Sequence, residues 1–408
     1  MKALRILAAA ALAIAVASCA DKGPELTKSG LDPQNFISEY NGAATALYTL
    51  TNENGMEVCI TNFGGRIVSI TVPAKDGSFK DVVLGFDKVS DYFPENNASD
   101  FGAAIGRYAN RIAGASFAID DVEYQLPAND GVNTLHGGPR GWQYQVYEVV
   151  EADETHVKIL RDSPDGDNSF PGNVKAYVTY TLCEDNSLDI YYEATTDAAT
   201  VINMTNHSYF NLGGDPSKDV LDEVLYINSS TTTPVGQGLI PTGEITSLLG
   251  TEMDFTTPKV IGQDIDKRDN PQIALGNGYD HNWILDTCGD ITVPAATLFS
   301  PETGIKLDVY TDEPGIQVYS GNFLNGSVTG KGGIAYNKRA GICLETQHYP
   351  DTPHNPEWPS VVLRPGETYT SQCIFAFSVC KCCEDGEGHE CCKDGEGHEC
   401  CKEECSNE

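Results

Sequence analysis

The sequence predicts an all-β fold, a large antiparallel β-sandwich, on three observations. Apolar and polar residues alternate with a period of two in several short runs, as in strands that bury one face. Long amphipathic helical stretches are absent, which argues against strands joined by crossover helices. Forty glycines among 408 residues exceed the usual ~7% and indicate many turns. Hydrophobic residues make up 40% of the chain, enough for a sizeable core between two packed sheets.

The predicted strands are separated by turn-like segments. They comprise residues 57–62, 66–72, 144–150, 156–160, 173–182, 188–194 and 374–379. In residues 173–182 every second side chain is apolar, and residues 188–194 repeat the pattern after a polar turn. Such pairs are typical of antiparallel hairpins.

The chain is strongly acidic, with a formal net charge of −33 and a pI near 4.4. Binding to nucleic acid or directly to an anionic membrane requires a basic surface, which this composition does not supply. The acidity does not identify a function, because a solvated acidic surface has the same composition.

The first 18 residues have the pattern of a signal peptide. Lys2 and Arg5 supply a positive start, and residues 6–17 form an apolar run too short to span a bilayer. Residues 16–19, Val-Ala-Ser-Cys, resemble a bacterial lipobox, in which the cysteine is lipidated and becomes the new N-terminus. Ordinary signal cleavage near the same place is the alternative.

We therefore expect lipidation at Cys19, followed by a polar tether over residues 19–35. No later segment is apolar enough to span a membrane. This interpretation predicts an exported lipoprotein of a bacterial cell envelope, in the periplasm or on the cell surface, held to the membrane only by its N-terminal lipid.

The fourteen cysteines fall into three groups. Cys19 belongs to the predicted anchor, and eight others lie in the tail, residues 380–408. Five are widely spaced through the body without metal or disulfide spacing, so we expect buried free thiols at Cys59, Cys183, Cys288, Cys343 and Cys373.

The tail repeats a nine-residue unit, Cys-Cys-x-Asp-Gly-Glu-Gly-His-Glu, at residues 382–390 and 391–399. Apart from cysteine the unit has no apolar residue to bury, so the tail is predicted to be an appendage. Its side chains could hold a soft metal such as Zn²⁺ or Cu⁺ through Cys382, Cys383, His389, Cys391, Cys392 and His398. Disulfides or a weakly structured acidic extension are the alternatives.

Glu345 and His207 are the main candidates for proton transfer. A carboxylate base and a donor that titrates near neutral pH are the minimum set for moving protons on opposite sides of a small molecule. Burial beside Leu344 would raise the pKa of Glu345 from about 4.3 toward that of a working base. Alternation along the strand instead favours an exposed glutamate. His207 follows an expected strand at residues 198–204, and for a single histidine a structural hydrogen bond is the commoner role.

Further polar residues lie where predicted strands end, and those of interest are Asn110, Arg111, His136, Asp280 and Gln317. The arginine fork suits sugar oxygens, but a salt bridge at a strand end fits Arg111 equally well. The histidines lack zinc-site spacing. The sequence also lacks a Gly-x-Ser-x-Gly elbow and a nucleotide-binding glycine loop, which weakens the hydrolase and dehydrogenase classes.

Taken together, these segments closely resemble the aldose 1-epimerase (galactose mutarotase) family. Ten motifs match in the family's order, at residues 62–66, 83–87, 106–112, 135–138, 170–173, 206–212, 240–243, 278–282, 314–319 and 343–347. They include Gly-Arg-Tyr-Ala-Asn-Arg-Ile, Asn-His-Ser-Tyr-Phe-Asn-Leu and Cys-Leu-Glu-Thr-Gln. Each motif is weak alone, but ten in order are very specific. The lipobox and the cysteine tail depart from the family and lie outside the body.

The resemblance implies a β-sandwich of the galactose mutarotase type over residues 36–379. It implies an isomerase that interconverts the α and β anomers of free hexoses such as glucose and galactose. Glu345 corresponds to the catalytic base and His207 to the catalytic acid, and the groups lining the sugar site correspond to Asn110, Arg111, His136, Asp280 and Gln317.

In the implied reaction, Glu345 takes the C1 hydroxyl proton while the His207 imidazolium protonates the ring oxygen. Neither a metal nor a redox cofactor is required, and we expect a monomer whose partner is a small aldose. Two rivals remain. One is a sugar-binding lipoprotein that has kept the scaffold and lost catalysis. The other is a hexose-phosphate epimerase, which needs additional basic groups in the site.

Overall fold

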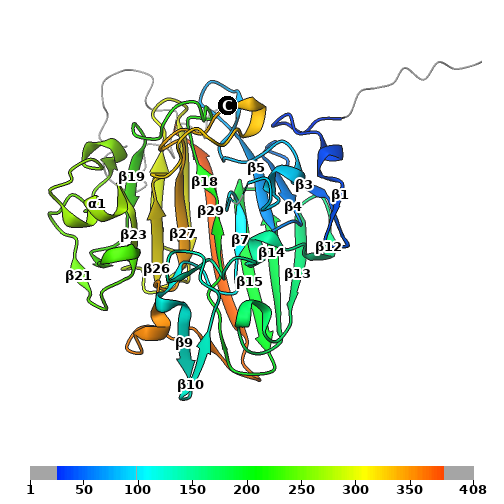
Figure 1. Ribbon diagram of the computed structural model, residues 1–408. Helices are drawn as coiled ribbons and strands as arrows, with labels where there is room; N and C mark the ends of the chain where they lie inside the picture. Colours follow the sequence, from blue (N-terminus) through cyan, green and yellow to red (C-terminus); the bar gives the residue numbers. More distant parts are fainter. Residues whose placement is uncertain (1–24, 98, 381–408) are drawn as a thin grey trace, which may run out of the picture.

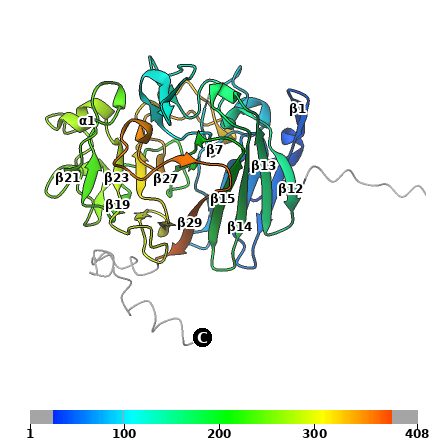
Figure 2. The same ribbon diagram turned by 90° about the horizontal axis from the view of Figure 1, so that it is seen from below.

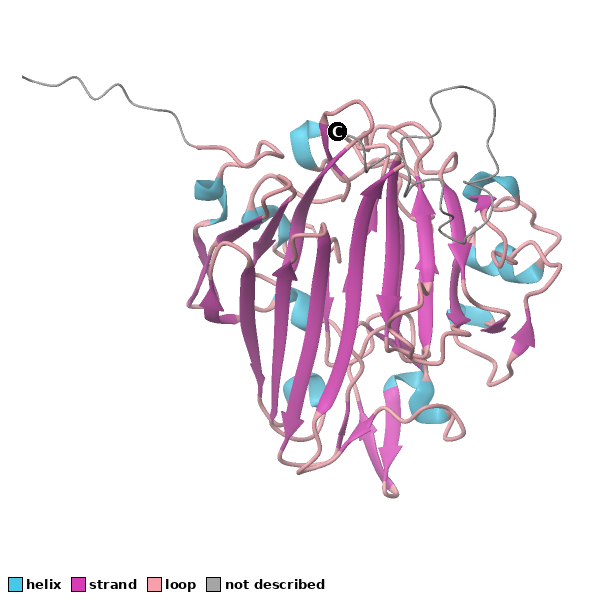
Figure 3. Ribbon diagram, turned by 180° about the vertical axis from the view of Figure 1, so that it is seen from behind, coloured by secondary structure: helices cyan, strands magenta, loops and turns pink. Residues whose placement is uncertain are grey.

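The computed structural model describes residues 25–97 and 99–380, and strands dominate them (Figure 3). The predicted signal peptide, Cys19 and the six candidate metal ligands of the tail lie outside these residues. No helix among the described residues is long and apolar enough to cross a membrane.

The largest sheet contains nine antiparallel strands, several of which run side by side in Figure 2. Their order is β12 (Glu148–Ala152), β13 (His156–Ser163), β14 (Val174–Leu182), β15 (Ser187–Thr196), β29 (Tyr369–Val379), β25 (Ile305–Thr311), β24 (Ala296–Phe299), β19 (Val224–Ile227) and β22 (Lys259–Val260).

The opposing layer is built from two smaller antiparallel sheets and a strand pair. The six-stranded sheet has the order β18 (Tyr209–Phe210), β27 (Ile342–Gln347), β26 (Gly315–Tyr319), β23 (Asp280–Ile284), β20 (Thr231–Thr233) and β21 (Thr246–Ser247). The four-stranded sheet has the order β3 (Leu47–Thr51), β4 (Glu57–Thr61), β5 (Arg66–Pro73) and β6 (Phe79–Asp81). The pair consists of β7 (Ala103–Ile105) and β17 (Thr205–His207).

Short elements complete the fold, and the helix α1 (Pro271–Gly276) lies at one edge of the molecule (Figure 1). The remaining strand pairs are β1 (Ser38–Tyr40) with β2 (Ala43–Thr45), β8 (Arg111–Ile112) with β11 (Thr134–Leu135), β9 (Ser116–Ile119) with β10 (Val122–Gln125), and β16 (Thr200–Val201) with β28 (Val362–Leu363).

The main core lies between the two layers. Val178 and Tyr180 of β14 belong to the same buried cluster as Ile70 of β5 and Leu344 of β27. The buried Tyr180 hydroxyl donates to the Gly65 carbonyl at 2.6 Å, so its polar atom is satisfied across the layers. The predicted all-β sandwich is confirmed.

Five of the predicted strands correspond closely to β4, β5, β13, β14 and β15. The strand predicted from residue 144 begins only at Glu148, because Trp142 and its neighbours form the 3₁₀ turn η4 (Trp142–Tyr144). In this turn the Trp142 indole packs on Gly106. A Cβ atom added to Gly106 would lie only 2.0 Å from the indole ring.

The strand predicted at residues 198–204 is formed only at β16. Beyond it, the chain leaves the sheet and the backbone of Asn203 pairs with residues 107–109 instead. The last predicted strand begins earlier than expected, at Tyr369.

Packing of the N-terminal segment begins before residue 36. Leu31 is 1% exposed and Phe36 is fully buried, both in a cluster beside the main core. The C-terminal part of residues 19–35 therefore packs against the sandwich.

The prediction of buried free thiols is correct for Cys59, Cys343 and Cys373. It is wrong for Cys183, which is partly exposed, and for Cys288, which is exposed. Both lie in turns after strands and not on an inward face.

Candidate active site

A pocket of about 160 Å³ opens at the face of β27 opposite the main core. A cavity of roughly 150 Å³ holds a benzene ring, so this pocket has room for one six-membered ring. Its walls are Asp100, Asn110, Arg111, Leu135, His136, His207, Tyr209, Asp280, Tyr319, Phe323 and Glu345. Six of the seven predicted site residues are among them.

Glu345 lies on β27, where side chains alternate as the sequence predicts. Ile342 and Leu344 belong to the main core, while Cys343 belongs to the second cluster on the other face and Glu345 faces the pocket. The expectation that this other face is exposed is wrong. Glu345 is only 2% exposed, because its face of the strand forms the floor of the pocket.

The environment of Glu345 favours a proton acceptor. Burial raises its pKa well above the ordinary value, the charges of Asp280 and Asp100 raise it further, and Arg111 opposes them. Its Oε2 atom is buried and has no hydrogen-bond partner among the described residues. A buried carboxylate oxygen of this kind is available to a ligand hydroxyl.

His207 is the last residue of β17, which pairs with β7. Its Nε2 atom lies 3.6 Å from Oε1 of Glu345, and its Nδ1 atom lies 3.5 Å from Sγ of Cys343. The ring stacks on Tyr209 with centroids 5.1 Å apart. Burial lowers the pKa of His207, and the charge of Asp100 raises it.

Glu345 and His207 are neighbours on one wall, because the end of β17 packs beside β27.

His136 and Asn110 are brought together by the pairing of β11 with β8. The backbone N–H of Asn110 donates to Nδ1 of His136 at 3.2 Å, so the neutral ring carries its proton on Nε2. Burial lowers the pKa of His136 well below its ordinary value, and the charges of His207 and Arg111 lower it further. His136 is therefore a neutral hydrogen-bond donor at the pocket wall.

Arg111 forms the predicted salt bridge and also lies in the pocket wall. Its Nε atom pairs with Oδ2 of Asp130 at 2.8 Å. Asp280, another residue of the pocket wall, accepts a hydrogen bond from Nε2 of Gln317 at 2.8 Å. Gln317 does not line the pocket itself, and this hydrogen bond is its link to the site.

Two other polar residues from the same motifs have structural roles. His281 is fully buried, its Nδ1 accepts the backbone N–H of Asp280, and burial lowers its pKa to about 4. Asn206 holds a turn, because its side chain accepts from Ser208 and donates to the Gly102 carbonyl.

Sequence reasoning missed Asp100 and the aromatic walls. Asp100 lies outside any strand, three residues before β7 begins, so no periodic pattern marks it. Tyr209 belongs to the motif at residues 206–212, but nothing in the sequence shows that its ring packs on His207.

Among the described residues, two overlapping sets of side chains could hold a metal ion, since the ligand atoms of each set lie within 4.8 Å of one another. One set is Asp100, His136 and His207, and the other is His207, Cys343 and Glu345. Both sets use His207, so metal binding and proton transfer would compete for the same nitrogen atoms.

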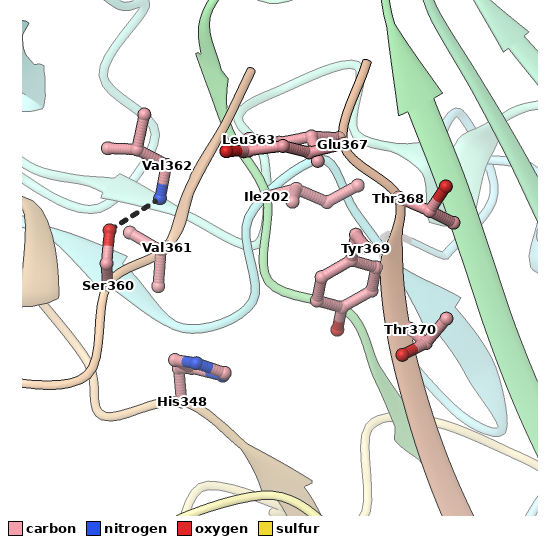
Figure 4. Close-up of a pocket in the computed structure, with 10 residues that line it drawn as sticks. All are labelled: Ile202, His348, Ser360, Val361, Val362, Leu363, Glu367, Thr368, Tyr369 and Thr370. Atoms are coloured by element: carbon pink, nitrogen blue, oxygen red, sulfur yellow. Dashed lines mark hydrogen bonds between the residues drawn. The ribbon is translucent and has the colours of Figure 1, made fainter. Parts of the chain in front are cut away.

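A larger hollow of about 330 Å³ lies between residues 360–363 and the start of β29 (Figure 4). Its histidine is already engaged, because Nδ1 of His348 lies 2.6 Å from Oε2 of the buried Glu313. Burial lowers the pKa of His348, but the Glu313 charge and hydrogen bond raise it above the ordinary value. Because this histidine is paired with Glu313, the smaller pocket remains the candidate active site.

The fold and the pocket define a class of protein. It is a β-sandwich enzyme whose pocket, sized for one sugar ring, holds a buried carboxylate beside an imidazole, with hydrogen-bonding groups around them.

Comparison with known proteins identifies the family. The family model described as aldose 1-epimerase matches residues 46–376, and the chain belongs to this family. A galactose mutarotase from Bos taurus is 39% identical over 338 residues, which cover 83% of this chain and 96% of that protein. An aldose 1-epimerase from Escherichia coli K12 is 39% identical with the same coverage.

Solved structures agree with the assignment. The galactose 1-epimerase from Lactobacillus acidophilus superimposes with a TM-score of 0.73 at 30% identity, covering 84% of this chain and 97% of that one. A GalM/aldose epimerase homologue from C. elegans gives a TM-score of 0.76 at 29% identity, covering 82% and 99%. The protein is an isomerase that interconverts the anomers of aldoses.

Proposed function

We propose that Glu345 and His207 interconvert the α and β anomers of free hexoses such as glucose and galactose by opening and reclosing the sugar ring. The observation that carries this proposal is the 3.6 Å distance between Nε2 of His207 and Oε1 of Glu345 at the floor of the pocket. The two sugar oxygens that exchange protons, the C1 hydroxyl and the ring oxygen, are both bonded to C1. An acid and a base that are close neighbours can therefore serve both oxygens.

The reaction begins when the Glu345 carboxylate removes the proton of the C1 hydroxyl. The electrons of that bond form the aldehyde as the bond between C1 and the ring oxygen breaks, and the ring oxygen takes a proton from the His207 imidazolium. Rotation about the bond between C1 and C2 presents the other face of the carbonyl. Reclosure reverses both transfers, so acid and base return to their starting forms. Each positioned proton transfer contributes about 10²–10⁴-fold.

In the working state, Glu345 and His207 share one transferable proton. Burial raises the pKa of Glu345 and lowers that of His207, so the two groups compete for one proton. The carboxylate–imidazolium form and the carboxyl–imidazole form contain the same number of protons and differ only in the position of one. We expect a bell-shaped pH profile that belongs to the pair as a whole.

The surrounding groups are suited to hold sugar hydroxyls. Nε2–H of His136 and the free guanidinium nitrogens of Arg111 donate, and the Asp280 carboxylate accepts. The Asn110 side chain lies on the same wall. Written with these residues, the reaction requires no metal or redox cofactor.

The pocket favours free sugars over phosphorylated ones. Arg111 is the one basic residue other than histidine in its walls, and Asp130 already pairs with it. Three carboxylates share the walls, namely Asp100, Asp280 and Glu345. A phosphate would therefore meet uncompensated negative charge.

Polarimetry on freshly dissolved α-sugars tests the function. We expect the protein to accelerate the mutarotation of glucose and galactose, and comparison with xylose and arabinose ranks its preference. Faster turnover of glucose 6-phosphate than of glucose would favour the hexose-phosphate epimerase. Sugar binding in calorimetry without any rate increase would favour a binding protein that has lost catalysis.

We also propose that the protein acts as a lipid-anchored monomer outside the bacterial cytoplasm, with a metal-binding tail. The support is the lipobox-like Val-Ala-Ser-Cys ending at Cys19 and the cysteine–histidine repeat after residue 380. Replacing Cys19 with alanine should release the protein from the membrane fraction. Equal metal content in the intact protein and in a chain ending at Val379 would remove the metal role of the tail.

A further inference from the structure

We propose that Phe323 is a further sugar-binding and specificity-determining residue, whose ring packs against the apolar face that the hydrogens on C3, C4 and C5 of the sugar form. This inference rests on the proposed function, because the roles of Glu345 and His207 set the orientation of the sugar. The contact would make Phe323 a residue that distinguishes galactose from glucose.

Aromatic rings form a continuous series from the acid to the opening of the pocket. Tyr209 stacks on His207 with centroids 5.1 Å apart, and Tyr319 meets Tyr209 edge to face at 5.9 Å. Phe323 stacks on Tyr319 at 6.3 Å with the ring planes 21° apart. All these rings line the pocket. Exposure rises along the series, from 8% at Tyr209 to 59% at Phe323, so Phe323 lies at the opening.

The loop that carries Phe323 follows β26 and is held by its neighbours. Asn322 is buried, and its Nδ2 atom donates to the carbonyl groups of Gly276 at 3.0 Å and Tyr279 at 2.8 Å. The backbone N–H of Phe323 donates to the Tyr319 hydroxyl at 3.0 Å. The ring is therefore presented on a fixed backbone, and little conformational entropy is lost when a ligand packs against it.

The proposed reaction determines which part of the sugar reaches Phe323. Glu345 and His207 act on the C1 hydroxyl and the ring oxygen, and both side chains are buried in the pocket. C4 lies opposite C1 in a six-membered ring, so C4 and its neighbours C3 and C5 extend toward the opening. These are the atoms that meet the exposed phenyl ring.

An aromatic ring distinguishes sugars by the hydrogens bound to their carbon atoms. The C4 hydroxyl of galactose is axial, which gathers the hydrogens on C3, C4 and C5 on one face as an apolar patch. The C4 hydroxyl of glucose is equatorial, so its C4 hydrogen points to the face opposite the hydrogens on C3 and C5. Burial of the larger patch stabilises the complex more, since the free energy scales with the apolar area removed from water. Phe323 should therefore favour galactose.

A single exposed phenylalanine is common on protein surfaces and does not by itself indicate a function. Phe79 of β6 is such a residue, since it is 43% exposed and does not line the pocket. Phe323 differs from it because it lines the pocket, continues a series of rings that reaches the acid and stands on a fixed loop. Phe79 therefore supplies a matched control.

The test measures kcat and KM for galactose and for glucose by polarimetry, with a thermal unfolding curve for each variant. We expect Phe323→Ala to raise KM for galactose about three- to tenfold, the contribution of one aromatic packing contact, and to raise KM for glucose less. The kcat should change little, because the ring does not touch the reacting oxygens and binds ground state and transition state alike. Phe323→Tyr should restore KM, and Phe79→Ala should behave as wild type in every measurement.

Three results would overturn the proposal. An unchanged KM in Phe323→Ala removes the contact with the sugar, and an equal rise for both sugars removes the contact with the C3–C5 face. A lowered unfolding temperature with a reduced kcat and an unchanged KM makes Phe323 a structural cover for Tyr319. Failure of the proposed function looks different, because Glu345→Gln would then keep the wild-type rate whatever Phe323 does.

Discussion

Replacing Glu345 with glutamine removes the proposed base and keeps the size of the side chain. We expect kcat/KM to fall by about 10²–10⁴-fold, the usual contribution of one positioned proton transfer. This loss corresponds to roughly 3–5 kcal/mol of transition-state stabilisation. The upper part of the range is expected, because Glu345 is 2% exposed and bulk water has little access to replace it. The other nearby carboxylate on this sheet, Asp280, is already bonded to Gln317.

The same substitution should not weaken the fold. The carboxylate of Glu345 is buried near Asp280 and Asp100, and burial and both charges raise its pKa. A neutral amide removes this like-charge repulsion and the desolvation cost of the anion. The unfolding temperature of Glu345→Gln should therefore equal or exceed that of wild type, which separates lost chemistry from lost structure.

The assay is polarimetry on freshly dissolved α-galactose, with the spontaneous rate measured without enzyme and subtracted. Glu223→Gln is the matched control, because Glu223 is also a buried glutamate but lies outside the pocket and accepts the backbone N–H groups of Leu212 and Gly213. The control should retain wild-type activity. A Glu345→Gln enzyme that relaxes the rotation as fast as wild type would refute the assignment of the base.

Three further predictions follow from the contacts of single residues. Cys343→Ala removes the thiol at Nδ1 of His207, and since one hydrogen bond is worth about 1 kcal/mol, kcat should fall about five- to tenfold. The kcat of Cys343→Ser should fall less. An alanine variant with unchanged kcat would show that the contact between Cys343 and His207 has no role in the reaction. Arg111→Met should raise KM about tenfold or more, since a hydrogen bond to a charged group contributes about 1.5–3 kcal/mol, while Arg111→Lys should raise it less. Initial rates measured against sugar concentration give KM for both variants, and an unchanged KM would contradict a sugar-binding role of Arg111. Burial raises the pKa of Glu223 to about 8, so the folded state favours its protonated form. The stability of wild type relative to Glu223→Gln should therefore fall by on the order of 5 kcal/mol as pH rises from about 4.5 through 8. Urea unfolding at pH 5 and pH 9 measures this, and a difference that does not vary with pH would contradict it.

Local periodicity predicted the strands well where one face packs on the main core. In β14 the buried residues alternate along the whole strand, as the sequence indicates. The same rule placed Glu345 correctly on the face opposite Leu344 and still gave the wrong exposure. Periodicity identifies the faces of a strand, whereas the cover over the second face comes from distant segments such as those carrying Asp100 and His136.

Asp100 and the breakdown of the strand expected at residues 198–204 share one cause. In both places the backbone is held by groups remote in sequence, namely the Arg66 side chain in one case and residues 107–109 in the other. Contacts of this kind leave no periodic trace near the residues they fix. The family resemblance supplied the sugar-site residues as a set, but it could not supply the distance between the acid and the base.

The distance between His207 and Glu345 also limits which sugar chemistry the pocket can carry out. An inverting glycosidase holds its two carboxyl groups about 6.5–9.5 Å apart to leave room for an attacking water, and a retaining one holds them about 5–5.5 Å apart across the bond that is cleaved. Nε2 of His207 and Oε1 of Glu345 are 3.6 Å apart, so neither a water molecule nor a second sugar unit fits between them. Two oxygen atoms on one carbon match this spacing, which is why the site suits the opening of a hemiacetal and not the hydrolysis of a glycoside.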